Sequence, residues 1–465
     1  MKSTRTLPRS RPPAPALALA GLLASMPLVP VLVAAMQPPS HRPSRGPLVV
    51  THCGDEGAGS LREAYAAAID GDEIDLGQLT CGTITLTSGA LVDDASASHV
   101  RITGPSRLSG RTLTISGNHA SRVFVHNGDE ALVLRNLSIE AGRHLDGNGG
   151  CVYSRGSVFA DTSAFFDCSV SGNEVHGGAI FAEGDVQLRA SSISGSSASG
   201  ASAASGGGVH ARGSVVLYAA SLQANIAIAA NGPVRTGEGG GVFAAGSAQI
   251  AFSTLTGNHA VVGGGVRAYG LSLYDSTLSG NLAELFGGGL AQVGGTPLVI
   301  ANSTIAFNRS DSGEGAGAYL DGAATIDSTL IAGNTHGFPG TASDVAGAPG
   351  SSVAGANNLV QATTLVMPLD TISADPLLDP LLQDNGGLTS THALLPDSPA
   401  IDRGGNPHGL CCDQRLQPPG SDIPFERVVG SAADIGAFET GAPDHILTDG
   451  FEPAIESRSL HASMR

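Results

Sequence analysis

The 465-residue chain contains no tryptophan, and only 4% of its residues are aromatic. Lysine occurs once, at Lys2, and acidic residues outnumber basic ones by 41 to 24. So few bulky side chains disfavour a globular α/β core, whereas 65 glycines suit a fold of thin repeated layers. Nucleic-acid affinity depends on basic groups that neutralise phosphates, so this acidic chain is not expected to bind nucleic acid.

The first 36 residues differ in composition from the rest. Four basic residues precede an apolar run over 14–36, a pattern typical of a secretory signal peptide. A retained membrane anchor is the alternative, because the run approaches the length of a transmembrane span. Pro27 and Pro30 within it favour removal, which changes the formal charge from −17 to −21. We therefore expect a secreted or outer-surface protein without a transmembrane span in the mature chain. DGFE at 449–452 resembles a short ending of exported proteins in some proteobacteria, which implies a Gram-negative bacterium.

Six cysteines follow the leader, and an even number predicts disulfides in an exported protein. Proximity in the sequence favours Cys53 with Cys81 and Cys151 with Cys168. The adjacent pair at 411–412 stays open, because a bond between neighbours is strained. No CxxC or His/Cys spacing indicates zinc, and neither a metal nor a cofactor is expected.

One phrase repeats through the middle of the chain: a short apolar strand, a Ser/Thr step, an Asn and a glycine cluster. It reads STLTGN then GGGV, and STLSGN then GGGL. Nine copies, aligned on the Asn position at spacings of 23 to 33 residues, have there Asn118, Gly142, Asn173, Ser196, Asn225, Asn258, Asn281, Asn308 and Asn334. Three residues earlier every copy is apolar, with Ile115, Ile139, Val170, Ile193, Leu222, Leu255, Leu278, Ile305 and Ile331.

This repeat predicts a β-solenoid. Two further, mostly apolar positions lie ten and eight residues before the Asn position, which is the spacing of a strand with one buried face. A step of five residues separates them from the apolar position three residues before the Asn, and this step indicates a bend between two strands. The glycine cluster begins a third strand, so three strands per turn predict a parallel β-helix of about nine turns. We interpret the Asn column as corners with left-handed backbone and side chains bonded between turns, and the glycines as points of close backbone approach.

Both ends of the repeat resemble known modules. GSLREA at 59–64 resembles the module named after its CSLREA motif, with Gly59 in place of the cysteine. Ser60 and Glu63 have the spacing of a capping box, which predicts a short helix over 60–69 that covers the open end of the solenoid. The phrases at 375–406 and 434–439, with DQR between them, resemble the signature of choice-of-anchor Q domain proteins of the pectate-lyase-like superfamily.

That resemblance implies an all-β, right-handed parallel β-helix that a C-terminal segment closes. Together, the patterns divide the chain into a signal peptide (1–36), a linker (37–50), an N-terminal cap module (51–107), the β-helix turns (108–350), a closing domain (351–440) and a flexible tail (441–465).

Catalytic motifs are scarce. A polysaccharide lyase of this superfamily would use calcium-binding carboxylates and a basic side chain that abstracts a proton, and a glycosidase would use paired Asp residues with GHG and RIK phrases. The chain has neither phrase and no lysine after the leader, and the pair Asp93 and Asp94 has no motif around it. A sugar-cleaving enzyme remains an alternative, as does a purely structural surface spacer.

One pattern points instead to binding. On each strand that follows a glycine cluster, the residue after the inward apolar side chain should face outward, as should the residue two positions further. The inner row is Tyr153, Phe181, His210, Phe243 and Arg267, and the outer row is Arg155, Glu183, Arg212 and Tyr269. Such aromatic and polar faces suit elongated ligands such as glycans. Alternatively, loops from neighbouring turns cover them.

We therefore expect a non-catalytic adhesin or glycan-binding protein, whose partners are extracellular glycans or the surface of a host or neighbouring cell. Changing Phe181, His210, Phe243 and Arg267 to Ala together is expected to abolish binding and to leave thermal stability nearly intact.

Overall fold

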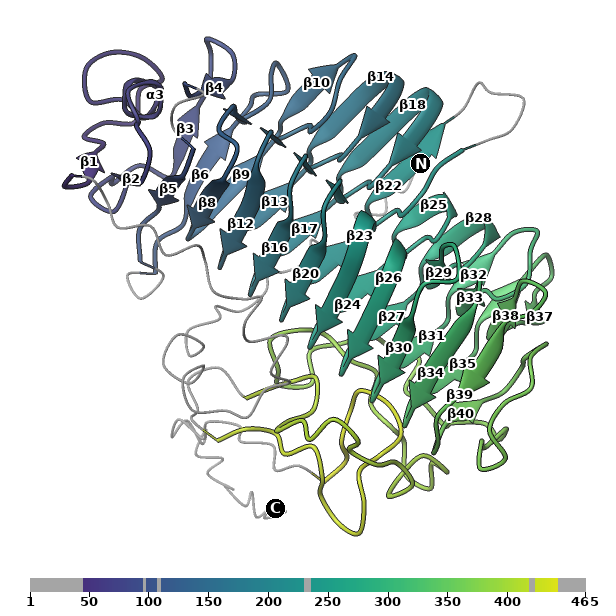
Figure 1. The fold of residues 1–465 in the computed structure, drawn as a ribbon. Coiled ribbons are helices and arrows are strands. Elements are labelled where there is room, and N and C mark those ends of the chain that lie inside the picture. Colours follow the sequence, from purple (N-terminus) through teal and green to yellow (C-terminus); the bar gives the residue numbers. More distant parts are fainter. Residues whose placement is uncertain (1–44, 95–97, 107–109, 230–235, 418–422, 442–465) are drawn as a thin grey trace, which may run out of the picture.

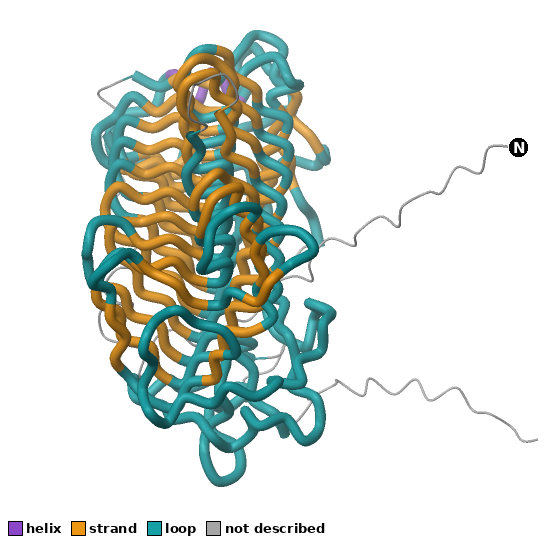
Figure 2. The backbone as a smooth tube through the Cα atoms, turned by 90° about the vertical axis from the view of Figure 1, so that its right-hand side faces the viewer, coloured by secondary structure: helices purple, strands orange, loops and turns teal. Residues whose placement is uncertain are grey.

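The computed structural model describes residues 45–441 apart from 95–97, 107–109, 230–235 and 418–422, and it is a right-handed parallel β-helix (Figure 1). The named strands pair in parallel from turn to turn, with β36 and β37 as the antiparallel exception. Figure 2 shows the strands stacked in layers along the rod, with loops gathered at its lower end. The predicted signal peptide, most of the linker and the tail after Gly441 lie outside the described residues.

Sheet B has 11 strands, stacked in chain order with one per turn. They are β3 (Thr83–Thr85), β6 (Leu113–Ser116), β9 (Leu137–Glu140), β13 (Ala164–Phe166), β17 (Ser192–Ser194), β21 (Ser221–Gln223), β24 (Thr254–Thr256), β27 (Thr277–Ser279), β31 (Thr304–Ala306), β35 (Leu330–Ala332) and β40 (Leu359–Val360). The count of nine turns is therefore two short, because β3 and β40 lie outside the aligned copies.

Sheet A has 20 strands in two strips. The first strip holds β4 (Leu91–Val92), β7 (Phe124–His126), β11 (Val152–Ser154), β15 (Ile180–Ala182), β19 (Val209–Ala211), β29 (Leu290–Gln292), β33 (Ala318–Leu320) and β38 (Val345–Gly347). The second holds β1 (Leu48–Val49), β2 (Asp72–Asp75), β5 (Val100–Thr103), β8 (Ala131–Arg135), β12 (Ser157–Asp161), β16 (Val186–Arg189), β20 (Val215–Tyr218), β30 (Leu298–Ala301), β34 (Ala323–Asp327) and β39 (Ser352–Ala354). The long strands β23 (Val242–Ala251) and β26 (Val266–Tyr274) run through both strips.

Sheet C has nine strands and follows the Asn column in each turn. They are β10 (Arg143–Leu145), β14 (Ser169–His176), β18 (Ser197–Ser205), β22 (Ile226–Ala229), β25 (His259–Val262), β28 (Leu282–Phe286), β32 (Arg309–Ser310), β36 (Thr335–His336) and β37 (Thr341–Ala342). The repeat did not predict this sheet, because strands such as SASGASAAS lack an alternation of large apolar residues.

The interior is a set of apolar columns. In sheet B, successive turns stack Ile193, Leu222, Leu255, Leu278 and Ile305, each 0% exposed. Burying one such side chain stabilises the fold by roughly 1.5–3 kcal/mol. The apolar column three residues before the Asn position is thus confirmed as core for these turns.

The third copy of the repeat is five residues out of register in the alignment. Phe165, and not Val170, pairs with Ile139 and Ile193 in sheet B, whereas Val170 belongs to sheet C. Cys168 therefore occupies the Asn position, where it forms a disulfide with Cys151. Both stretches fit the repeat in sequence, because Phe165 lies three residues before Cys168 and Val170 lies three residues before Asn173.

The other cysteines are bonded as well. Cys53 is joined to Cys81, as proximity in the sequence favoured, and the adjacent Cys411 and Cys412 form the third disulfide.

A ladder of buried asparagines joins six turns. The side-chain amide of each donates to the side-chain oxygen in the next turn at 2.8–2.9 Å, along the series Asn225, Asn258, Asn281, Asn308, Asn334 and finally Asp344. The predicted bonds between stacked Asn side chains are therefore confirmed. The left-handed backbone lies one residue earlier than expected, at Ala224, Gly257, Gly280, Phe307 and Gly333, with φ between 54° and 68°.

The glycine clusters permit close contact between turns. The first glycine of a cluster is left-handed, as at Gly263 with φ 66°. A Cβ atom added to Gly264 would lie 2.3 Å from the carbonyl oxygen of Leu282 in the next turn. The structural interpretation of these glycines is confirmed.

The short helix α3 (Leu61–Ala66) lies at the N-terminal end of the rod (Figure 1). The Ser60 hydroxyl accepts a hydrogen bond from the Glu63 amide at 3.2 Å, as the capping box predicts. The helix ends earlier than expected, with Ala67 as its C-cap. Leu61 and Tyr65 are buried against the first turns.

Residues 375–440 pack along the side of the last turns and not across their end (Figure 1). Outward threonines of sheet B hold this segment: Thr254 Oγ1 donates to the Ser390 carbonyl oxygen at 2.6 Å, and Thr277 Oγ1 donates to Gln414 Oε1 at 2.6 Å. The last turn itself is closed by an earlier stretch, through bridges from Val345 and Leu359 to residues 363 and 372.

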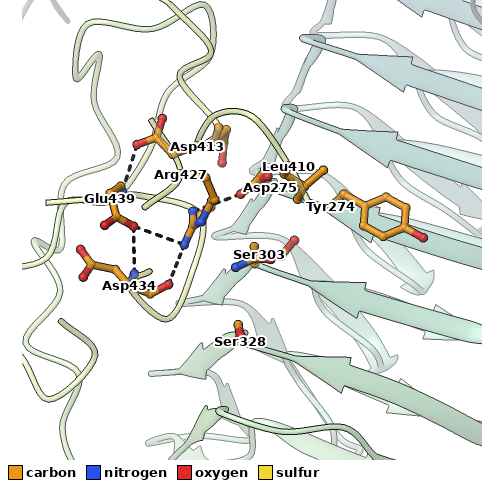
Figure 3. A network of polar contacts seen from close by, with 12 residues as sticks. Tyr274, Asp275, Ser303, Ser328, Leu410, Asp413, Arg427, Asp434 and Glu439 are labelled. Atoms are coloured by element: carbon orange, nitrogen blue, oxygen red, sulfur yellow. Dashed lines mark hydrogen bonds and ion pairs between the residues drawn. The ribbon is translucent and has the colours of Figure 1, made fainter. Parts of the chain in front are cut away.

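A buried charge network fixes the same segment to the solenoid (Figure 3). Arg427 Nη1 donates to Asp275 Oδ1 at 3.1 Å, and Nη2 donates to the Asp434 carbonyl oxygen at 2.6 Å and lies 3.8 Å from Glu439 Oε2. Burial raises the pKa of Glu439 to about 7, and it also raises the pKa values of Asp275 and Asp413. Desolvation of the charged carboxylates is the main cause, although the arginine opposes it.

The Asn ladder gives a first testable prediction. Asn281→Ala removes the acceptor of the Asn258 amide groups and the donor to the Leu255 carbonyl oxygen, so it leaves buried polar atoms unpaired. We expect the free energy of unfolding to fall by about 3–5 kcal/mol in urea denaturation. Asn173→Ala is the control, because the Asn173 side chain is exposed and outside the ladder. A similar loss for both variants would contradict the role of the ladder.

The charge network gives a second prediction, on pH. A carboxyl group with a raised pKa binds its proton more tightly in the folded state, so its stabilising contribution is complete below its ordinary pKa of 4.5 and is lost as pH rises through about 7. Glu439→Gln should therefore lose less stability than the unmodified protein between pH 5 and 8, measured by thermal denaturation. Glu426→Gln, an exposed change in the same segment, should leave the pH dependence unaltered. Parallel curves for Glu439→Gln and the unmodified protein would refute this assignment.

Candidate functional site

The candidate inner row lies in register on the first strip of sheet A. Tyr153, Phe181, His210, Phe243 and Arg267 are paired turn by turn, one residue after the inward column that begins at Val152. All five therefore point to the outside of the β-coil, as strand alternation requires.

The aromatic members of this row form one continuous stack. The ring centroids lie 5.6 Å apart from Tyr153 to Phe181, 5.2 Å from Phe181 to His210 and 4.8 Å from His210 to Phe243, with interplanar angles of 10°, 23° and 17°. The guanidinium of Arg122 lies 5.3 Å above the Tyr153 ring at one end of the stack. These contacts make the inner row a rigid element along four turns.

Most of the stack is covered. Phe181 is 0% exposed and His210 is 6% exposed, whereas Tyr153, Phe243 and Arg267 are partly buried. The ends of the neighbouring sheet C strands lie against it, and the His176 ring from β14 is 4.7 Å from His210. The inner row is therefore mainly a packed layer, and a ligand could touch it only at its half-buried members.

A serine links the two histidines. Ser205 Oγ lies 2.6 Å from His176 Nδ1 and 2.7 Å from His210 Nδ1. The hydroxyl has one proton to donate, so one imidazole accepts it and the other donates its own Nδ1 proton to the oxygen. Burial lowers the pKa of His210 to about 3 and also lowers the pKa of His176, so this cluster is uncharged at neutral pH.

Sequence reasoning missed this second layer, although a signal existed. His176, Ser205 and Glu238 each directly precede a glycine cluster, and the chain there passes from sheet C to sheet A. The position just before each cluster thus faces the stack. Glu238 forms an ion pair with Arg267, with 3.2 Å between Oε1 and Nε.

The outer row is accessible. Arg155 and Tyr269 are exposed, and the Arg212 and Glu183 side chains are 62% and 31% exposed. Arg212 Nη1 lies 2.8 Å from Glu183 Oε2, and its guanidinium is 6.0 Å from the Phe181 ring. The outer row therefore presents charged groups on three successive turns, about 4.8 Å apart, and Tyr269 two turns further, beyond Ala245.

Carboxylates elsewhere in the chain have structural partners. Asp93 Oδ2 and His126 Nδ1 are hydrogen-bonded at 2.5 Å, and both side chains are 0% exposed. Asp379 and Asp384 accept backbone amide hydrogen bonds from Leu381 and Gly386 in turns. In the described ranges, no group of three or more His, Cys, Asp or Glu side chains could hold a metal ion, and no helix is long and apolar enough to cross a membrane.

Burial of the stack changes the expected outcome of mutating it. Phe181→Ala should lower the free energy of unfolding by about 3–5 kcal/mol, because it leaves a cavity between Tyr153 and His210. The quadruple Ala variant is therefore not expected to keep its thermal stability. Tyr269→Ala, at a side chain 46% exposed, should change stability by less than about 0.5 kcal/mol. Urea denaturation of the two single variants checks this, and equal effects would contradict the packed layer.

No protein-family model, no curated protein and no solved structure matches this chain in the comparisons made. The repeat and the folded structure identify it as a parallel β-helix, and its site has to be interpreted from its own residues.

Proposed function

We propose that the protein is an exported β-helix that binds elongated glycans along the outer row of sheet A without cleaving them. The observation that carries the proposal is the accessible row of Arg155, Glu183 and Arg212 on three successive turns and Tyr269 two turns further, above a rigid aromatic stack. An elongated ligand can contact several of these turns at once.

The chemistry of the row suits sugars. Arg155 and Arg212 supply several N–H donors for ring and hydroxyl oxygens, and Glu183 accepts from hydroxyl groups. Tyr269 offers an exposed ring face for the apolar side of a sugar. The Glu183–Arg212 ion pair is largely exposed and contributes at most about 1 kcal/mol, so it can open for a ligand at little cost.

Export is part of the same proposal. Three disulfides are typical of proteins that fold in an oxidising compartment, and the N-terminal sequence resembles a secretory signal. The resemblance of the chain to CSLREA and choice-of-anchor Q modules supports display on, or release from, a Gram-negative cell. A host or neighbouring cell surface would then carry the glycan.

A pair of matched double variants tests the row. Arg212→Ala with Tyr269→Ala should weaken glycan binding about tenfold or more, measured by calorimetry on ligands selected from a glycan array. Arg309→Ala with Phe166→Ala removes one exposed arginine and one exposed aromatic from sheets C and B. This control should bind like the unmodified protein. If the row variant binds as tightly as the control, the row is not the site.

The same glycan panel separates binding from cleavage. The mature protein is incubated with acidic and neutral polysaccharides, with and without calcium, and the products are assayed for new reducing ends and unsaturated sugars. We expect no products. Their appearance would replace the binding proposal with a sugar-cleaving enzyme.

A further inference from the structure

A second outward surface lies on the adjoining strip of sheet A. The strands β8, β12, β16 and β20 lie side by side there (Figure 1), and register places Arg135, Asp161, Arg189 and Tyr218 in one outward column. Arg155 is four residues before Phe159, and Glu183 is four residues before Gln187. The outer row and this second surface therefore cross the same turns.

The charges in this column are unevenly paired. Asp161 binds Arg189 with both oxygens, including a 3.0 Å bond from Nε to Oδ1. Arg135 Nε lies 3.8 Å from Asp161 Oδ2 and has no hydrogen-bond partner in the part of the chain that the structure describes. One carboxylate thus serves two guanidinium groups, and only Arg189 is closely bound.

The arginine of the preceding turn adds to the imbalance. Arg101 Nη1 is 3.9 Å from Glu73 Oε2, and its Nε is also unpaired among the described residues. Burial lowers the pKa of Arg135, repulsion by Arg101 and Arg189 lowers it further, and attraction by Asp161 and Glu73 opposes these effects. Three arginines and two carboxylates leave one excess positive charge, in a chain that is strongly acidic overall.

Beside these charges is a small open hollow. It is lined by Phe159, Gln187, Leu188, Arg189, Val216 and Tyr218. Gln187 Oε1 is buried and has no partner among the described residues, and the same holds for Gln249 Oε1 two turns later. The hollow has a volume of about 10 Å³, which is room for about one water molecule or hydroxyl group and not for a sugar ring.

We propose that this surface is an anion subsite, where Arg135, whose side chain is 29% exposed, binds the carboxylate or sulfate group of an acidic sugar. The inference rests on the proposed glycan binding and assigns the charge class of the ligand, which spans the outer row and this subsite.

Calorimetry with three oligosaccharides of equal length tests the subsite: an alginate oligomer with carboxylates, a sulfated dextran oligomer and neutral maltooctaose. The unmodified protein should bind one or both acidic ligands at least tenfold more tightly than the neutral one, and raising the salt concentration should weaken that binding. The stronger acidic ligand identifies the anion. Equal binding of all three would overturn the subsite.

Variants test the role of Arg135 itself. Arg135→Gln should weaken binding of the acidic ligand about 10- to 100-fold, because it removes a charged hydrogen bond. Arg309→Gln, at an exposed arginine paired with Asp311 elsewhere, should have no effect. Asp161→Asn should tighten acidic binding, since it removes the competing carboxylate, and a misfolded protein could not produce such a gain.

The two proposals fail in different ways. If Arg135→Gln and Asp161→Asn leave acidic binding unchanged while Arg212→Ala with Tyr269→Ala abolishes it, the subsite is wrong and the outer row stands. If no glycan binds at all, both are wrong.

Discussion

Every feature of this protein depends on the pairing of each turn with the next. Backbone hydrogen bonds in three parallel sheets transmit one register along about 11 turns. The Asn ladder fixes the corner between sheets B and C, because each side chain is 0% exposed and satisfies a backbone amide of the previous turn. The glycine clusters lie beside this ladder: a Cβ atom added to Gly241 would be 3.2 Å from the Asn258 side chain and 2.7 Å from the Gly265 carbonyl oxygen of the next turn. Side chains are thereby stacked in straight columns.

A column of outward-facing side chains is not always accessible to a ligand, as the inner and outer rows of sheet A show. The inner row has the composition of a ligand platform, yet the ends of sheet C cover Phe181 and His210 and turn them into a packed layer. The outer row, two residues further along, remains accessible. A packed layer beneath an exposed row favours ligand binding, because groups that are already held in place lose less conformational freedom when they bind a ligand.

The C-terminal segment also contacts side chains that are stacked from turn to turn. It runs beside the last turns, and the outward threonines of sheet B become its hydrogen-bond partners. Arg427 then joins carboxylates from both the solenoid and the segment within the protein interior. Earlier turns of sheet B lack this cover, which leaves Phe166 52% exposed.

The sequence by itself determined the solenoid, the inward columns, the role of Asn and Gly at the corners, and the pairing of Cys53 with Cys81 and Cys151 with Cys168. These follow from periodicity and proximity, which are local properties of the chain. Only the tertiary structure decided that Cys168 takes an Asn position, that sheet C exists, that His176 and Ser205 lie against the stack, and that residues 375–440 lie beside the rod. Each depends on which distant segment covers a surface, and alternation along a strand specifies the face of a side chain but not its neighbours across that face.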